Sequence, residues 1–233
     1  GVANDTGKLR PSLQHGLEAA LSVSDSMIDE VLAHLSLVTD PGRLTNLPQE
    51  LAAIDPDQVE QLVLHSDALK ATWDRELRRQ FFEGGGHENE SQLTVRFDDL
   101  RQLDDRHIDA SIEFAMVEQE LSRATAGLLP RLNALMSSLM GWLTVQPDLN
   151  PLRPAAYARA LRAVLLVHVP DPAQRSALFV PVAGILGESL RQVYRELIQW
   201  LHAHGVEPLE SPQTLLQDKT PRNAVGRTLL TLG

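Results

Sequence analysis

Apolar side chains recur along the chain at intervals of three and four residues, the spacing that places them on one face of an α-helix. The best candidate for a strand, residues 92–97, is short and stands alone. The pattern therefore predicts an all-α fold. We expect a multi-helix bundle of six to eight helices, formed as a single domain by residues 1–210, and an extended C-terminal tail over residues 211–233.

The first half of the chain predicts two short helices, near residues 13–21 and 25–37, and then a loop over residues 40–48 that is rich in turn-forming residues. A long helix is expected to start after Asp55, a natural N-cap that is followed by Pro56, and to end at Gly84. The apolar stripe of this helix comprises Val59, Leu62, Val63, Leu69, Trp73, Leu77 and Phe81.

The middle of the chain predicts a helix that starts at Asp104 or Asp105 and that Pro130 should break. A broad buried face is expected on this helix, made by Ile108, Ile112, Phe114, Ala115, Val117 and Leu121. The helix after Pro130 is expected to bury a second set of residues, namely Leu132, Leu135, Met136, Leu139, Met140 and Leu143.

Two further helices are predicted near the C-terminus. The stretch NPLRPAAYARALRAVL should start one of them near Pro154, with Asn150 as a cap. Pro181 should kink the last long helix or delay its start, and Gly205 should end it. The buried faces of the two helices are predicted to be Tyr157, Leu161, Val164, Leu165 and His168, and Leu186, Leu190, Val193, Leu197 and Leu201.

Composition limits the kinds of chemistry that this chain can support. It is 43% hydrophobic and contains no cysteine, which excludes disulfides, thiolate metal sites and a cysteine nucleophile. The lack of cysteine also fits a reducing, cytoplasmic location, and no uncharged apolar run reaches the roughly 20 residues of a membrane span. Because the first residue is Gly instead of Met, we interpret the sequence as a segment of a longer protein.

The formal net charge of −10 is uneven along the chain, because residues 151–233 carry +3 and the preceding residues are strongly acidic. The N-terminal part, residues 1–97, is acidic. This argues against nucleic-acid binding, because that function requires a continuous basic face. The mildly basic C-terminal part could attract a smaller anion or the acidic surface of a partner.

The densest group of acids comprises Asp104, Asp105, Asp109 and Glu113, with His107 among them. A metal-dependent hydrolase would use such acids together with several histidines, whereas this cluster has one. The alternative is a structural role for the cluster, because acids in the first turn of a helix interact favourably with the helix dipole. No other pattern indicates a catalytic residue, a bound metal or a cofactor, and the sequence predicts none of the three.

Three arginines of the second half could hold an anion. Arg153 would stand beside the N-terminus of the helix that begins near Pro154, where free N–H groups favour a carboxylate or phosphate. Arg159 and Arg162 follow on the same helix, three residues apart. The alternative interpretation is that these arginines pair with acids of the first half.

Four stretches occur in a fixed order between residues 100 and 209: LRQLDDRHIDASIEF, LLPRLNALM, NPLRPAAYARALRAVL and LRQVYRELIQWLHAHGVEPL. In this order they resemble domain-of-unknown-function family 1631, a family of large cytoplasmic proteins of proteobacteria. The most specific pieces are the N-P-L-x-P run that starts at Asn150 and the G-V-x-P run that starts at Gly205. The resemblance is clearest over roughly residues 100–209, within a family-like helical part that covers residues 98–210, and it implies no established catalytic residues.

Some relatives in this family are linked to cyclic di-GMP signalling through a PilZ-like domain, which binds through R-x-x-x-R followed by D/N-x-S-x-x-G. The arginine spacing occurs here at Arg75 and Arg79, and again at Arg191 and Arg195, inside predicted helices. The second half of the motif is incomplete, because Phe114 stands where Gly is required. The resemblance therefore does not extend nucleotide binding to this segment.

These observations favour a non-catalytic helical scaffold or regulatory module that acts through protein–protein contacts, within a larger bacterial protein linked to cyclic di-GMP signalling. One alternative is a small-anion or nucleotide sensor that uses Arg153, Arg159 and Arg162. Another is a hydrolase that uses the acid cluster between Asp104 and Glu113.

The tail carries two pairs of leucines that offer a contact with a partner. An ordered tail needs contacts that offset a conformational entropy of about 1–2 kcal/mol per fixed residue. We expect these leucines to dock on the bundle of their own chain or on a neighbouring copy, and the second arrangement would give a homodimer by tail exchange. The residues concerned are Leu215, Leu216, Leu229 and Leu230.

Overall fold

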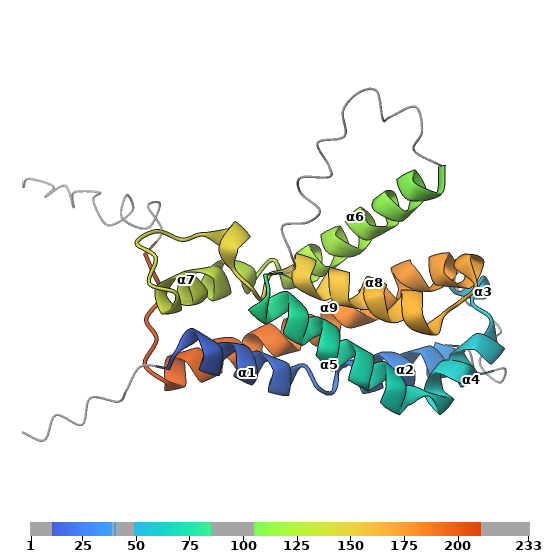
Figure 1. Ribbon diagram of the computed structural model, residues 1–233, viewed down its shortest axis with the longest axis horizontal. Coiled ribbons are helices and arrows are strands. Elements are labelled where there is room, and N and C mark those ends of the chain that lie inside the picture. The colour runs from blue at the N-terminus through green and yellow to red at the C-terminus, as the bar shows by residue number, and fades with distance from the viewer. Residues whose placement is uncertain (1–10, 39, 41–48, 85–104, 211–233) are drawn as a thin grey trace, which may run out of the picture.

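The computed structural model describes residues 11–38, 40, 49–84 and 105–210, and the regular elements within these ranges are helices without any strand (Figure 1). The α-helices are α1 (Leu13–Val23), α2 (Met27–Val38), α3 (Gln49–Ala52), α4 (Pro56–Leu64), α5 (Ser66–Phe82), α6 (Asp105–Thr125), α7 (Leu129–Leu139), α8 (Pro154–His168) and α9 (Pro172–Ala203), and one 3₁₀ turn, η3, covers Pro147–Leu149.

The predicted all-α bundle is confirmed. Seven helices remain in the described part of the chain when the one-turn α3 is set aside and α4 and α5 are taken as the single helix that the pattern predicts. Residues 92–97, the strand candidate, lie outside the described ranges. No described helix has both the length and the apolar character needed to cross a membrane.

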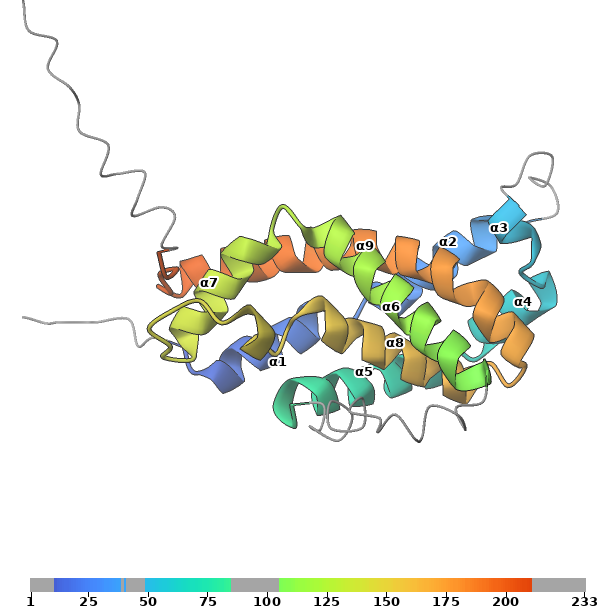
Figure 2. The same cartoon turned by 90° about the horizontal axis from the view of Figure 1, so that it is seen from above.

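Helix α9 runs along most of the long axis of the bundle (Figures 1 and 2). The helix pairs with the most extensive packing are α6 with α9 and α5 with α8. Helices α1 and α2 lie on the side of α9 that is opposite to α6 (Figure 1), so that elements from both halves of the chain share one apolar core. Helix α7 and the loop that follows it form one end of the bundle, and α4 lies at the other (Figure 2).

Local sequence signals fix several helix boundaries. The side chains of Asp55 and Asp171 each accept a hydrogen bond from the backbone N–H two residues later, and each is followed by proline in the first turn of α4 or α9. Gly84, Gly141 and Gly205 have positive φ angles just after α5, α7 and α9, a conformation that glycine adopts without steric cost. The predicted ends at Gly84 and Gly205 are confirmed.

An aromatic cluster joins α5, α8 and α9 in the core. The ring of Tyr157 lies 5.5 Å from Phe81 and 6.2 Å from both Trp73 and Tyr194, measured between ring centroids. The Tyr157 hydroxyl is 3.0 Å from Ser24 Oγ, and Tyr194 Oη donates to the carbonyl of Leu152 at 2.5 Å. Burial raises the pKa of both tyrosines, so their hydroxyls stay protonated and able to hydrogen-bond.

The helix predicted after Asp55 is divided in two. The backbone leaves helical geometry at His65, between α4 and α5, because α4 packs on α2 whereas α5 packs mainly on α8. The change of direction leaves Val63 exposed, so its assignment to the buried stripe is wrong. The other six residues of the stripe are buried.

Helix α6 buries a narrower face than the pattern predicts. Val117 and Leu121 are buried and Phe114 is half-buried, but Ile112 is 53% exposed and Ala115 is also exposed. The reason is that the N-terminal half of α6 projects away from the other helices (Figure 1), so no described helix covers it. The side chain of Ile108 lies outside the described residues.

Helix α7 ends earlier than predicted. Leu132, Leu135 and Met136 are buried, as expected, but the positive φ of Gly141 turns the chain, and Leu143 is 95% exposed instead of buried. Leu139 and Met140 are half-buried.

Helix α9 begins before Pro181 and continues through it. Asp171 caps the helix, which starts at Pro172, so Pro181 does not delay the start. Pro181 has no backbone N–H and so removes one hydrogen bond from the helix. The helix stays continuous there because Phe179 and Val182, on either side of the proline, are buried in the core. The predicted seam of α9 and the four apolar residues of the α8 face are buried, and His168 is half-buried.

Candidate functional site

The N-P-L-x-P run forms a corner between η3 and α8. Asn150 is buried, and its Nδ2 donates to Asn133 Oδ1 at 2.8 Å, while its Oδ1 accepts from the backbone N–H of Leu152 at 2.9 Å. The side chain of Asn150 therefore closes a turn ahead of α8 and does not cap that helix, so the predicted cap is wrong. Arg153 holds the N-cap position, and α8 begins at Pro154 as predicted.

The three candidate anion-binding arginines are spread along α8. Arg153 is half-buried, and its Nη1 donates to the carbonyl of Asn150 at 3.3 Å. Arg159 is half-buried and Arg162 is exposed, and no ion pair joins either of them to an acid within the described ranges. None of the three lines the pocket described below. Anion binding by these arginines stays a prediction.

The acid cluster lies mostly where side chains are not described. Asp104 is outside the described residues, as are the side chains of Asp105, His107 and Asp109 on α6. Glu113 is half-buried on the same helix. Among the described side chains, no group of three or more metal-ligating residues comes together. The four tail leucines, Leu215, Leu216, Leu229 and Leu230, also lie outside the described residues.

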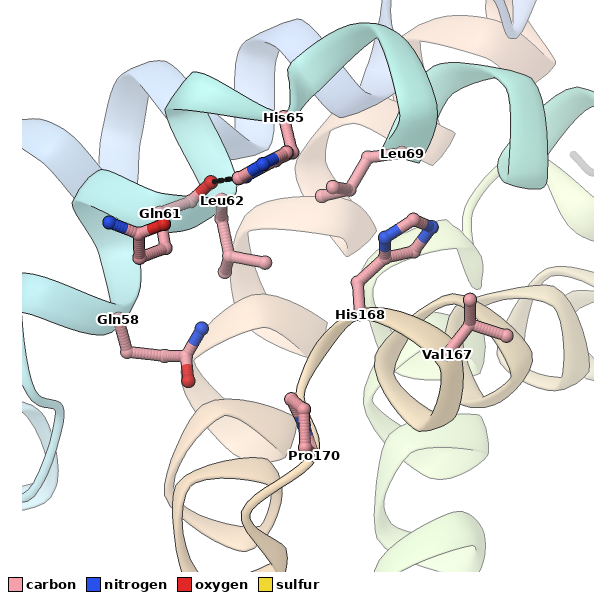
Figure 3. A pocket seen from close by; sticks show the side chains of 8 residues that line it. All are labelled: Gln58, Gln61, Leu62, His65, Leu69, Val167, His168 and Pro170. Carbon is pink, nitrogen blue, oxygen red and sulfur yellow. Dashed lines mark hydrogen bonds between the residues drawn. The ribbon is translucent and has the colours of Figure 1, made fainter.

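A pocket of about 360 Å³ lies between α4, the start of α5 and the end of α8 (Figure 3). Buried leucines from α4 and α5 form its apolar part, and two histidines and two glutamines supply polar groups. Its lining residues are Gln58, Gln61, Leu62, His65, Leu69, Val167, His168 and Pro170.

Hydrogen bonds fix which nitrogen of each histidine carries the proton in the neutral ring. Thr72 Oγ1 donates to the carbonyl of Ala68 at 3.0 Å, so it must accept from His168 Nε2, which is 2.8 Å away. His65 Nδ1 is 2.8 Å from the carbonyl of Gln61, which can only accept. The remaining nitrogens, Nδ1 of His168 and Nε2 of His65, are therefore lone-pair acceptors, and Figure 3 shows one nitrogen of His168 turned toward the pocket.

The electrostatic environment of the pocket favours the neutral form of His168. Burial lowers the pKa of His168, and the nearby His65 and Arg75 lower it further. No Asp, Glu, Lys or Arg is among the lining residues. The pocket thus offers acceptor nitrogens and carboxamides beside an apolar floor.

The second notable surface is the loop of residues 140–149, called here the 140–149 loop. It displays Leu143, which is 95% exposed, Trp142, which is 43% exposed, and the exposed Leu149. Large apolar side chains that gather on one exposed loop commonly mark a contact surface.

The 140–149 loop is tied to α7 by two hydrogen bonds to Ser137. The carbonyl of Ser137 accepts from the backbone N–H of Trp142 at 2.9 Å, and Ser137 Oγ accepts from the backbone N–H of Gln146 at 2.9 Å. Gln146 Nε2 also donates to Thr144 Oγ1 at 2.9 Å. Leu143 and Trp142 are therefore presented on a closed turn whose base is the buried Ser137.

A third surface is the projecting half of α6. Ile112 and Met116 are one helical turn apart, and both are about half exposed. They make an apolar stripe on a helix segment that stands apart from the bundle (Figure 1).

Neither the two histidines of the pocket nor the exposed side chains of the 140–149 loop were predicted from the sequence. His65 and His168 belong to different helices far apart in the chain, and no local spacing connects them. For Trp142 and Leu143 a signal existed: Gly141 is a helix-ending residue, and its position would have placed both side chains beyond α7.

The fold defines this protein as an all-α helical bundle. Comparisons of the chain with protein-family models, with curated proteins and with solved structures give no match. The resemblance to domain-of-unknown-function family 1631 thus stays a prediction.

Proposed function

We propose that this chain is a non-catalytic helical scaffold module that acts through protein–protein contacts, and that the 140–149 loop is one of its contact surfaces. The observation that carries the proposal is the exposure of Trp142 and Leu143 on a turn closed by hydrogen bonds. Tryptophan is enriched among the residues that dominate binding energy at protein interfaces. A preformed loop also loses little conformational entropy when it binds.

The projecting half of α6 supports the scaffold interpretation, because a scaffold needs more than one contact surface. Ile112 and Met116 lie on a different element from the 140–149 loop, and α6 departs from the bundle with its own apolar stripe. Under the predicted family resemblance, the module would belong to a large bacterial protein linked to cyclic di-GMP signalling, and it would position partners there without performing a reaction.

Site-specific photocrosslinking tests the loop as a contact surface. A photoreactive side chain placed at position 143 should give adducts of discrete mass in cells that contain the partner, whereas the same group at the exposed Ala71 of α5 should not. Adding Trp142→Ala should weaken the adducts from position 143. Equal adducts from both positions, or none from position 143, would show that the loop is not a specific contact surface.

Leu143→Asp supplies the control for folding. Because Leu143 is almost fully exposed, its replacement should change the free energy of unfolding by less than about 0.5 kcal/mol. Loss of the contact with unchanged stability separates a binding role from a structural one.

A further inference from the structure

The apolar stripe on the projecting half of α6 is left uncovered by the described helices (Figure 1). Ile112 is 53% exposed and Met116 is 48% exposed, and the exposed Ala115 lies on the same face. The segment that leads into this helix, residues 85–104, lies outside the described residues. We propose that the apolar part of this segment, residues 93–103, packs on the stripe within the same chain.

The sequence of the segment supplies the side chains for such a contact. Residues 85–92 contain no large apolar residue, whereas the next eleven positions contain five. Large apolar side chains gain free energy when they leave water, and Ile112 presents exposed apolar surface nine positions after Leu103. The five residues are Leu93, Val95, Phe97, Leu100 and Leu103.

The two ends of the segment bring it past the stripe. It follows Gly84 at the end of α5 and precedes Asp105, the first residue of α6. Helix α5 ends toward the α7 side of the molecule, whereas α6 begins at a tip that points the other way (Figures 1 and 2). The connection therefore has to pass along the N-terminal half of α6, which is the half that carries the stripe.

The segment is also long enough to reach the stripe from the tip of α6. Asp105 and Met116 are about 16 Å apart along the helix axis, at a rise of about 1.5 Å per residue. Residues 93–103 cover about 36 Å when fully extended, at about 3.3 Å per residue. Contact with Ile112 and Met116 therefore needs no change in α6.

A contact within the chain is favoured over a contact with a separate molecule. Residues 104–111 join the segment to the stripe, and closing a loop this short costs little conformational entropy. A second copy or another protein would in addition lose translational and rotational freedom.

Charge opposes the pairing of α6 with α6 of a second copy. Residues 105–120 carry five acids and one arginine, so two such helices repel each other. Residues 93–103 carry two arginines, Arg96 and Arg101, and two aspartates, so this part of the segment has no net charge. It therefore approaches the acidic α6 without that repulsion.

This inference rests on the proposed function at one point, because it names what competes with a partner for the α6 stripe. A partner that contacts Ile112 and Met116 would have to displace residues 93–103. The 140–149 loop takes no part in this contact, so photocrosslinking at position 143 judges its role separately.

Oxidation of methionine by peroxide measures the accessibility of the stripe. The chain contains four methionines: Met116 on the stripe, Met27 and Met136 in the core, and the half-buried Met140. Exposed methionine is converted to the sulfoxide, and mass spectrometry of peptides gives the rate at each position. The chain unfolded in urea supplies the rate for a fully exposed side chain.

Two substitutions in the segment should release the stripe. If the contact is populated about nine-tenths of the time, Phe97→Ser with Leu100→Ser should make Met116 react roughly tenfold faster, because only the open form reacts. The rate at Met140 should not change, and slow reaction of Met27 and Met136 shows that the fold is intact. Thr94→Ser with Gln102→Ser is the matched control at polar positions of the segment, and it should leave every rate unchanged.

Two outcomes would overturn the inference. If Met116 reacts in the unmodified chain as fast as in urea, the stripe is open and residues 93–103 do not pack on it. If Met116 reacts slowly in the unmodified chain and equally slowly after Phe97→Ser with Leu100→Ser, another occupant covers the stripe. A rate that depends on protein concentration would then identify a second copy, and a constant rate would indicate the tail. Neither outcome affects the contact role of the 140–149 loop, which fails only if position 143 gives no specific adducts.

Discussion

Two glycines of α9 provide a test of how closely the main helix pair is packed. Gly184 and Gly187 lie one turn apart in the same helix, yet their surroundings differ. A Cβ atom added at Gly187 would come within 2.9 Å of the Cβ of Ala124 on α6, whereas a Cβ at Gly184 would meet no atom within 4 Å. The same substitution, glycine to alanine, should therefore have opposite effects on the free energy of unfolding.

The magnitudes follow from two contributions. Alanine in place of glycine within a helix stabilises by about 0.5–1 kcal/mol, and this applies at both positions. At Gly187 the new methyl group would be well inside the ordinary carbon–carbon contact of about 3.5–4.0 Å. Because the opposing atom is also a Cβ, no rotation of a side chain relieves the contact, and α6 and α9 must separate. Such overpacking costs about 1–3 kcal/mol.

Urea denaturation followed by far-UV circular dichroism measures both variants. Gly184→Ala should stabilise by up to about 1 kcal/mol, and Gly187→Ala should destabilise by about 1–2 kcal/mol. The difference between them, about 1–3 kcal/mol, isolates the packing contribution because the helix propensity is common to both. If Gly187→Ala stabilises as much as Gly184→Ala, α6 does not approach α9 as closely as this structure has it.

Three further predictions concern the α8 region. Asn150→Ala should destabilise the fold by about 2–6 kcal/mol, because it leaves two buried hydrogen-bond partners unsatisfied at about 1–3 kcal/mol each. In a double-mutant cycle, its effect should be less than additive with that of Asn133→Ala. Leu161→Ala should cost about 2–5 kcal/mol as a truncation in the core and Arg159→Ala less than about 1 kcal/mol, and the reverse order in denaturation would mean that α8 is held by its charges. The pKa of His168 is below its usual value near 6.5 in the folded state, so the unfolded chain binds the proton more readily. Stability should therefore fall as pH drops through 6.5, and it should fall less in His168→Gln. Denaturation at several pH values measures both.

The sequence was sufficient to predict the helices, because their signals are local. Asp55 with Pro56, and Gly205 after an apolar seam, mark helix ends through backbone chemistry within a few residues. Apolar periodicity, in contrast, predicts which face of a helix is able to be buried and not which part of it has a neighbour. Ile112 and Leu121 satisfy the same pattern on α6, but only Leu121 lies where α9 covers the helix.

The pocket could not be predicted, because it depends on where distant helices meet. His65 ends α4 and His168 ends α8, and each looks like an isolated polar residue in the sequence. The acceptor role of His168 is set by a third element, since Thr72 on α5 fixes its proton, whereas that of His65 is set by the carbonyl of Gln61 on α4. A pairing of this kind becomes visible only after the packing of α5 on α8 is known.

Buried polar groups are concentrated at the base of the 140–149 loop. Of the nine buried polar side chains in the described part of the chain, four lie there: Asn133, Ser137, Ser138 and Asn150. A polar group costs free energy when it is buried unless it is hydrogen-bonded, and apolar residues would stabilise this region at least as well. Ser137 and Asn150 instead bond to the backbone of residues 146 and 152, on either side of η3. Their hydrogen bonds specify the path of the chain, so the loop that exposes Trp142 and Leu143 has a defined shape, which is the property that a contact surface requires.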